Sequence, residues 1–303
     1  MRRILITGGS GLLALNWAMA ARDCSLVTLG MHKRNVVVPG VQSLPINLES
    51  VDDFMHALET VAPHVVIHAA GLTSVEQCEF NPELAHHINV TLAANVAKAC
   101  DKTGVDLVHI STDHLFSGRD SLVDEKQPAD PINVYGITKA EAEDRVLAIN
   151  PNSLVIRTNF YGWGASYRQS FSDHVIDALR NGSNLTLFND VFYTPILVET
   201  LALAVNELID LKVSGILNVV GDERISKYQF GICLSEEFGL HPEKIICSSL
   251  ADQKNLVKRP FDMSLSNQKV CTILGRRLGG VTDHLARLHQ QELNGLAQEI
   301  RKC

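Results

Sequence analysis

The sequence lacks the features that mark membrane, secreted and zinc-binding proteins. None of its apolar runs approaches the roughly 18 residues that a membrane-spanning helix needs. After Arg2-Arg3 only three apolar residues precede the first glycines, which is too few for the core of a signal peptide. The seven cysteines are odd in number and scattered, without a C-x-x-C pair. We therefore expect neither a disulfide framework nor a metal site, and we predict a cytoplasmic location.

The sequence also lacks an excess of basic residues. It has 27 lysines and arginines against 34 aspartates and glutamates, a formal net charge of −7. Binding to nucleic acid phosphates needs a concentrated basic surface, so we expect no nucleic-acid partner. With 303 residues, 46% of them hydrophobic, the composition is that of an ordinary globular protein of about two domains.

Short apolar runs alternate with helical patterns over the first 160 residues. The clearest helix is expected to begin at Asn81-Pro82 and to continue to Lys102, and another to begin at Ser50. In the long helix, helical spacing predicts a buried face formed by Leu84, Ile88, Leu92 and Val96. The predicted strands are 3–7, 25–29, 64–68, 105–110 and 153–156. This alternation predicts an α/β fold, a Rossmann-type doubly wound parallel sheet.

The alternation loosens after residue 160, where a smaller C-terminal α/β part is expected. We predict a nucleotide-binding domain over 1–158, with 170–219 returning to it. The substrate-binding part is then formed by 159–169 and 220–303. Further helices are expected over 169–181, 196–211, 226–238 and 281–301.

A glycine-rich turn follows the first predicted strand and precedes a helix. This strand-turn-helix context is the one in which a dinucleotide fingerprint is meaningful. Gly8 permits the tight turn, and Gly11 allows a pyrophosphate to approach the backbone amides at the start of the helix. Ala14 is small enough for close packing of helix on strand. We expect Ser10 and Leu12, which lie in the same turn, to contact the cofactor as well.

No acidic residue follows the second predicted strand, where an NAD-binding protein usually has one for the ribose hydroxyls. Three basic side chains, His32, Lys33 and Arg34, occupy that position instead. They would suit a 2′-phosphate, so NADP(H) is favoured over NAD(H). The alternative is a solvated charge cluster without a ligand.

Tyr135 and Lys139 form a Y-x-x-x-K motif 23 residues after Thr112, which ends the fifth predicted strand. Residues four apart share one helix face, so the ammonium can lie beside the phenol. We expect the cation to lower the tyrosine pKa toward a value useful for proton transfer. Thr112, at the carboxyl end of a strand, could hydrogen-bond a substrate carbonyl. The alternative is a half-buried tyrosine beside a lysine with only a structural role.

Together these segments resemble the extended short-chain dehydrogenase/reductase superfamily, and its dTDP-4-dehydrorhamnose reductase branch in particular. The resemblance extends over nearly the whole chain, although its later motifs are less specific. It rests on TGGSGLLA at 7–14, HAAGLTSVEQCE at 68–79, INVTLAANVAKAC at 88–100, STDHLFSG at 111–118, NVYGITKAEAE at 133–143, RTNFYG at 157–162, and Arg259-Pro260 before Ser264-Leu265.

The resemblance implies a role for each matched residue. Tyr135 would be the general acid, Lys139 would bind the nicotinamide ribose, and Thr112 would orient the keto group. The cofactor would be lined by Gly8, Gly11, Asn47, Leu48, Ala69 and Ala70. The substrate would be contacted by Asp113, His114, Asn159, Phe160 and Arg259.

Three departures from the family pattern bear on the substrate. Asn47 stands where an aspartate is usual beside adenine, His114 replaces a tyrosine, and Asn159-Phe160 replaces a Ser-Trp pair. They leave the hydride chemistry intact and put rhamnose in doubt. Dehydratases of the superfamily carry an acid at the position of His114, so dehydration is disfavoured.

The resulting hypothesis is NADP(H)-dependent reduction of a nucleotide-linked 4-keto-6-deoxy sugar. Two alternatives stay open: a sugar-nucleotide epimerase with retained NAD, and a non-catalytic subunit resembling the regulatory β subunit of methionine adenosyltransferase. The resemblance further implies a homodimer formed through helices that include 82–102 and 132–149.

Overall fold

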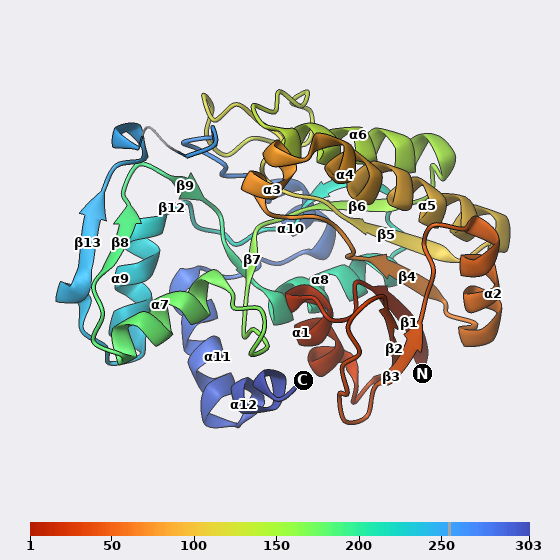
Figure 1. Ribbon diagram of the computed structural model, residues 1–303, viewed down its shortest axis with the longest axis horizontal. Helices are drawn as coiled ribbons and strands as arrows, with labels where there is room; N and C mark the ends of the chain where they lie inside the picture. The colour runs from red at the N-terminus through yellow and green to blue at the C-terminus, as the bar shows by residue number, and fades with distance from the viewer. Residues whose placement is uncertain (254–255) are drawn as a thin grey trace.

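The computed structural model describes residues 1–253 and 256–303, and a parallel β-sheet forms its centre (Figure 1). The strand order is β11-β6-β5-β4-β1-β2-β3, and all neighbouring strands run parallel. The order reverses between β1 and β4, so the predicted doubly wound sheet is confirmed. The strands are β1 Arg2–Thr7, β2 Ser25–Met31, β3 Gln42–Pro45, β4 Val65–His68, β5 Asp106–Ile110, β6 Leu154–Arg157 and β11 Gly215–Asn218.

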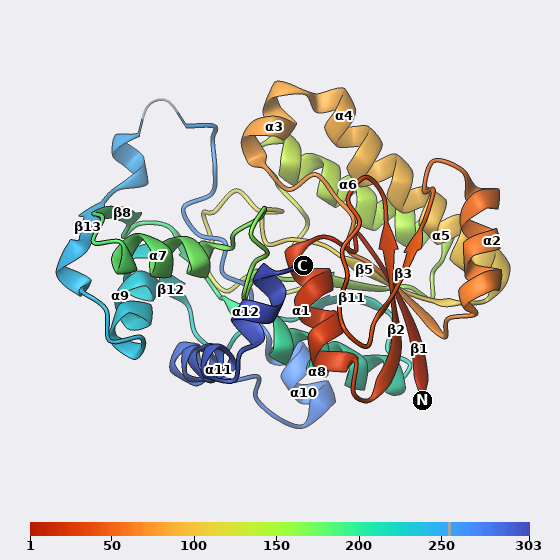
Figure 2. The same ribbon diagram turned by 60° about the horizontal axis from the view of Figure 1, so that its bottom comes forward.

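Helices cover both faces of the sheet (Figure 2). Side chains of β1 alternate between the two layers: Leu5 packs in the core with Phe54 and Val96, whereas Ile4 packs with Leu15 and Leu201. One layer contains α2 Val51–Val61, α5 Leu92–Thr103 and α6 Val134–Ile149; the other contains α1 Leu12–Ala21, α8 Val198–Asp210 and α10 Gln268–Leu274. No helix of the described ranges is long and apolar enough to cross a membrane.

The helix expected from Asn81 begins there but is not uniformly α-helical. The Asn81 side chain accepts a hydrogen bond from the amide of Leu84, as an N-cap does. The helix consists of α4 Pro82–His86, a π-helical turn His87–Thr91, and α5; α3 Val75–Phe80 precedes it. The predicted buried face was wrong in part. Leu84, Ile88 and Leu92 line a cavity, and only Val96 is buried in the core.

The C-terminal half forms a second packed group beside the sheet. Of the span 170–219 that was expected to return to the sheet, α8 and β11 do so. Two other elements of the span, α7 Phe171–Arg180 and β8 Leu185–Phe188, pack against α9 Lys227–Glu237 and β13 Ile245–Ser248. The domain boundaries themselves stay a prediction.

The remaining elements are short apart from α11. The helix expected over 281–301 is interrupted at Gly295, which has a φ of +84°. The remaining elements, in chain order, are β7 Phe160–Tyr161, β9 Phe192–Tyr193, β10 Ile196–Leu197, β12 Ile225–Ser226, 3-10 turns at Pro242–Lys244 and Leu250–Asp252, α11 Val281–Leu293 and α12 Leu296–Arg301.

Phe230 of α9 holds the second group together, and its truncation tests that role. Its fully buried ring lies 4.9 Å from the ring centre of Tyr161, 5.7 Å from Phe171 and 5.9 Å from Tyr193. We expect Phe230→Ala to lower the free energy of unfolding by about 3 to 5 kcal/mol in urea titrations. The control is Phe80→Ala, at a side chain that is 92% exposed, with an expected change within about 0.5 kcal/mol. Equal effects of the two substitutions would contradict this packing role.

Candidate active site

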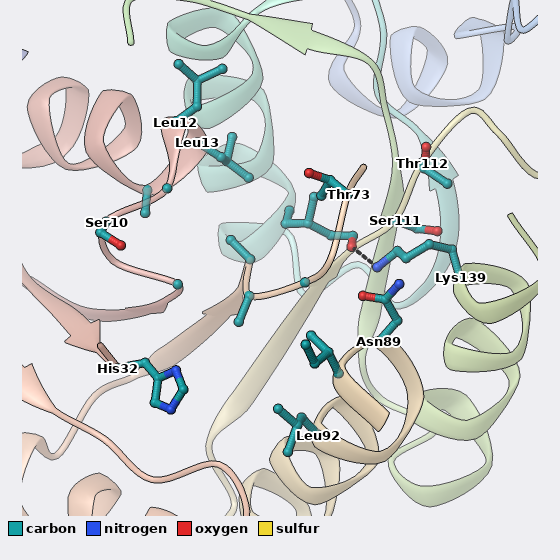
Figure 3. Close-up of a pocket in the computed structure, with 18 of the residues that line it drawn as sticks. Ser10, Leu12, Leu13, His32, Thr73, Asn89, Leu92, Ser111, Thr112 and Lys139 are labelled. Atoms are coloured by element: carbon teal, nitrogen blue, oxygen red, sulfur yellow. Dashed lines mark hydrogen bonds between the residues drawn. The ribbon is translucent and has the colours of Figure 1, made fainter. Parts of the chain in front are cut away.

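A cavity of about 730 Å³ lies where β1, β4 and β5 end (Figure 3). This is the carboxyl edge of the sheet, beside the point where the strand order reverses, and open α/β sheets bind ligands there. The cavity brings together almost all of the predicted site residues: Gly8, Ser10, Gly11, Leu12, His32, Lys33, Asn47, Leu48, Ala69, Ala70, Thr112, Asp113, His114, Tyr135, Lys139, Asn159 and Phe160.

Two predicted residues, Arg34 and Arg259, do not line the cavity. The Arg34 guanidinium lies over the ring of Tyr167, 4.0 Å from its centre. Arg259 forms an ion pair with Glu76. In both cases a partner from a distant part of the sequence holds the arginine outside the cavity wall.

The glycine-rich turn fits closely against the turn that follows β4. Gly8 has a φ of +69°, and a Cβ atom there would lie 2.9 Å from the backbone N and Cα of Ala70. The Thr7 hydroxyl is 2.8 Å from His68 Nδ1 and accepts hydrogen bonds from the amides of Ala69 and Ala70. The two turns therefore meet backbone against backbone, and only glycine suits position 8.

Lys139 carries the charge at the base of the cavity. Its Nζ donates to the Ile110 carbonyl at 2.8 Å and lies 3.3 Å from His109 Nε2. Burial lowers the lysine pKa to about 8, while the charge of Glu143, one turn later on α6, opposes that shift. Figure 3 shows Lys139 beside Asn89 and Ser111 on the cavity wall.

Two neutral histidines lie beside Lys139 on neighbouring strands. The rings of His68 and His109 stack with their centres 5.4 Å apart. Burial lowers the pKa of His68 to about 3 and that of His109 well below its usual value, and the Lys139 charge acts in the same direction. Of these three neighbouring side chains, only Lys139 carries a positive charge at neutral pH.

Tyr135 is held at the start of α6. The Asn133 side chain accepts from the Gly136 amide and donates to the Lys258 carbonyl, which fixes the first turn. The Tyr135 ring contacts His114 edge-on, with ring centres 5.4 Å apart. Burial raises the pKa of Tyr135, and a hydrogen bond with Thr112 opposes the shift. The expected lowering by Lys139 was therefore wrong: burial sets the direction of the pKa shift, and the cationic charge that opposes it is that of Arg168.

Asp113 and Asn159 form a polar pair on the cavity wall. The Asn159 amide donates to the Asp113 carboxylate. Lys227, at the start of α9, lies beyond this pair with its ammonium 3.4 Å from the ring centre of Tyr193. Burial lowers the pKa of Lys227 to about 8, and the charge of Asp113 opposes that shift.

Sequence reasoning missed several residues that the fold brings to the cavity. Asn89, in the π-helical turn, accepts from the Leu72 amide and donates to the Leu72 carbonyl and the Thr138 hydroxyl. Its place in the middle of a predicted helix gave no sign of this role. Arg168 lies in an irregular segment for which the sequence shows no pattern. The other missed lining residues include Thr73, His87, Ile110, Ser111, Thr158 and Gln169.

The arrangement is an oxidoreductase site of the extended short-chain dehydrogenase/reductase type, with a glycine-rich turn, a strand-end threonine and a Tyr-Lys pair around one cavity. The family is equally clear. The model of the RmlD substrate binding domain matches residues 1–293, so the chain belongs to that family.

Known relatives and structures carry different functions. The probable low-salt glycan biosynthesis reductase Agl14 of Haloferax volcanii is 29% identical over 287 residues, which is 93% of this chain and 96% of the relative. Methionine adenosyltransferase 2 subunit beta of Mus musculus is 27% identical and covers 79% of this chain and 73% of its own. The structure of dTDP-4-dehydrorhamnose reductase from Bacillus anthracis in complex with NADP is 23% identical, with a TM-score of 0.83 over 96% of this chain and 99% of that one.

The buried ammonium of Lys139 generates a prediction about stability. Its pKa of about 8 lies below the ordinary value of 10.5, so the folded protein binds fewer protons than the unfolded chain between these values. The destabilising effect is fully present below pH 8 and fades toward pH 10.5. Lys139→Met removes this destabilising effect. The free energy of unfolding of Lys139→Met minus that of the wild type should therefore fall by about 2 kcal/mol between about pH 7.5 and about pH 9.5.

Urea unfolding at the two pH values measures this difference. Other groups that titrate in this range contribute to both proteins and cancel in the comparison. Lys98→Met, at an exposed lysine of α5, serves as the control and should show no such change. A difference for Lys139→Met that is independent of pH would contradict the prediction.

Proposed function

We propose that the protein is an NADP(H)-dependent reductase of a nucleotide-linked 4-keto-6-deoxy sugar. The observation that carries the proposal is that Thr112, Tyr135 and Lys139 line one cavity together with the glycine-rich turn. Tyr135 and Lys139 come from one helix and Thr112 from a strand end, so three separate sequence signals converge on one place. The names of the Haloferax and Bacillus relatives support the reaction class and the cofactor.

The residues present fit a dinucleotide. Gly8 has no side chain and lies in close contact with Ala70. A pyrophosphate could therefore approach the backbone amides of the two turns. Ser10, Gly11 and Leu12 would contact it at the start of α1. His32 and Lys33 line the cavity after β2 and would face the adenosine ribose. When bound, the cofactor supplies the hydride.

The protein residues supply the proton and hold the substrate. Tyr135, whose pKa burial raises, is protonated at neutral pH and can donate its hydroxyl proton to the oxygen of the reduced carbonyl. Thr112 would hydrogen-bond the same oxygen and orient it. Lys139 would bind the nicotinamide ribose, held in place by the Ile110 carbonyl. Asp113 and Asn159 would face the hydroxyls of the sugar.

The decisive experiment removes the hydroxyl of Tyr135. Tyr135→Phe should retain folding and NADPH affinity while kcat falls by roughly 100- to 10,000-fold, the usual range for a positioned acid. Lys139→Met should weaken cofactor binding as well as turnover. The measurement is NADPH oxidation at its absorbance band with a panel of nucleotide-linked 4-keto sugars. A Tyr135→Phe protein with wild-type turnover would contradict the proposed role of Tyr135.

A second candidate is a non-catalytic binding subunit, favoured by the similarity to methionine adenosyltransferase 2 subunit beta. It predicts that no keto sugar is reduced and that Tyr135→Phe still rescues a deletion strain. The epimerase alternative predicts instead that the purified protein retains a full equivalent of NAD through gel filtration. Neither outcome is compatible with a reductase whose cofactor exchanges in each cycle.

The basic residues after β2 predict the cofactor preference. Charge-assisted bonds to a 2′-phosphate should make the Kd for NADPH about 5- to 150-fold lower than that for NADH in fluorescence titrations. Lys33→Gln should reduce this preference more than Arg34→Gln, because Lys33 lines the cavity and Arg34 lies over Tyr167. Lys98→Gln, at a surface lysine on α5, is the control. Equal affinities of the wild type for both cofactors would contradict the prediction.

A further inference from the structure

An irregular segment between β7 and α7 crosses to the cofactor side of the cavity. We call residues 165–169 the crossing segment; in Figure 1 it belongs to the green loop that approaches the start of α1. The Tyr167 hydroxyl donates to the Ser10 carbonyl at 2.9 Å. The Arg168 Nη2 donates to the Thr73 hydroxyl, also at 2.9 Å. One short segment therefore contacts both the glycine-rich turn and the turn after β4.

Arg168 differs from the other arginines in its position and in its contacts. It is the only arginine of residues 1–253 and 256–303 that lines the cavity. Its hydrogen-bond partner is a neutral hydroxyl, and within the same ranges it forms no ion pair with a carboxylate. The guanidinium thus keeps its charge and most of its donors available toward the cavity.

We infer that Arg168 binds the diphosphate of the dinucleotide, on the side opposite the glycine-rich turn. The inference rests on the proposed function, because it takes the dinucleotide as the cofactor. A diphosphate carries two negative charges, and the planar guanidinium matches its oxygens with two parallel donors. The turn residues Gly8, Ser10 and Gly11 provide backbone amides but no cationic side chain, and Arg168 supplies the missing charge.

The residues that the crossing segment contacts indicate whether Arg168 binds the diphosphate of the cofactor or that of the sugar nucleotide. Ser10 and Thr73, which the segment contacts, belong to the turns expected to hold the cofactor. The residues expected to contact the sugar, Asp113, Asn159 and Phe160, instead follow β5 and β6. The diphosphate of the sugar nucleotide would have to lie nearer to those residues. The contacts of Arg168 therefore favour the cofactor.

Arg34 connects the crossing segment to the turn after β2, which also lies at the carboxyl edge of the sheet. Its guanidinium over Tyr167 links the turn after β2 to the crossing segment. The segment thereby touches the turns that follow β1, β2 and β4, which together surround the cavity. A dinucleotide held beneath it would leave only when these contacts open, so Arg168 should act mainly on the dissociation rate.

Arg168→Gln tests the inference without disturbing the core, because Arg168 is exposed on its loop. We expect the Kd for NADPH and the Kd for NADH to rise by the same factor, about 10- to 100-fold, mostly through faster dissociation. Arg168→Lys should recover part of this loss. The matched control is Arg145→Gln, at an exposed arginine of α6, with unchanged affinities.

Two further probes assign the site. Adenosine 2′-monophosphate carries the 2′-phosphate but neither phosphate of the diphosphate, so its Kd should change less than about twofold in Arg168→Gln. A loss confined to NADPH and this monophosphate would overturn the inference in favour of a 2′-phosphate contact. A loss confined to dTDP or to the KM of the sugar substrate would overturn it in favour of the substrate diphosphate.

The controls also separate this inference from the function proposed above. If the wild type binds both dinucleotides and Arg168→Gln binds them equally well, only the role of Arg168 fails. If the wild type binds neither dinucleotide, the proposed function fails and this inference fails with it. Thermal unfolding of each variant verifies that the fold is retained.

Discussion

The contact between the turns after β1 and β4 is the constraint on which the site depends. Gly8 lies against the backbone of Ala70 so closely that no Cβ atom fits between them. The Thr7 hydroxyl joins the same two turns by accepting from both alanine amides. Because β1 and β4 are adjacent parallel strands at the reversal of the sheet, this contact fixes the width of the cavity and directs the backbone of both turns toward it.

The electrostatics of the cavity follow from strand register. His68 and His109 are directly paired on β4 and β5, and both are buried and neutral. Lys139 reaches the same layer from α6 and is held by the carbonyl of Ile110, the residue next to His109. The positive charge of Lys139 therefore lies beside two neutral histidines, with its ammonium held at the end of β5. Tyr135, one helical turn earlier, keeps its proton because burial disfavours the phenolate.

The sequence allowed the sheet and most of the site to be predicted, because both rest on local patterns. Strand and helix periodicity places Thr112, Tyr135 and the glycine-rich turn at one edge once the strands are parallel. The two arginine predictions failed because of long-range contacts. Arg259 pairs with Glu76, 183 residues away, and Arg34 packs on Tyr167. The π-helical turn shifts which side chains of the helix face the core, so Leu84 and Ile88 line the cavity.

Under the proposed function, chemistry and substrate recognition would come from different parts of the chain. The residues that would hold the cofactor and donate the proton lie at the sheet edge and on α6, in strand ends and a helix whose geometry the core determines. Asn159 and Phe160, which would contact the sugar, lie after β6, where the chain forms only the two-residue strand β7 before the crossing segment. A change in these loops can alter the ligand without moving Lys139 or Tyr135. Such a separation gives a physical reason why relatives named as a probable reductase and as an adenosyltransferase subunit can both resemble this chain.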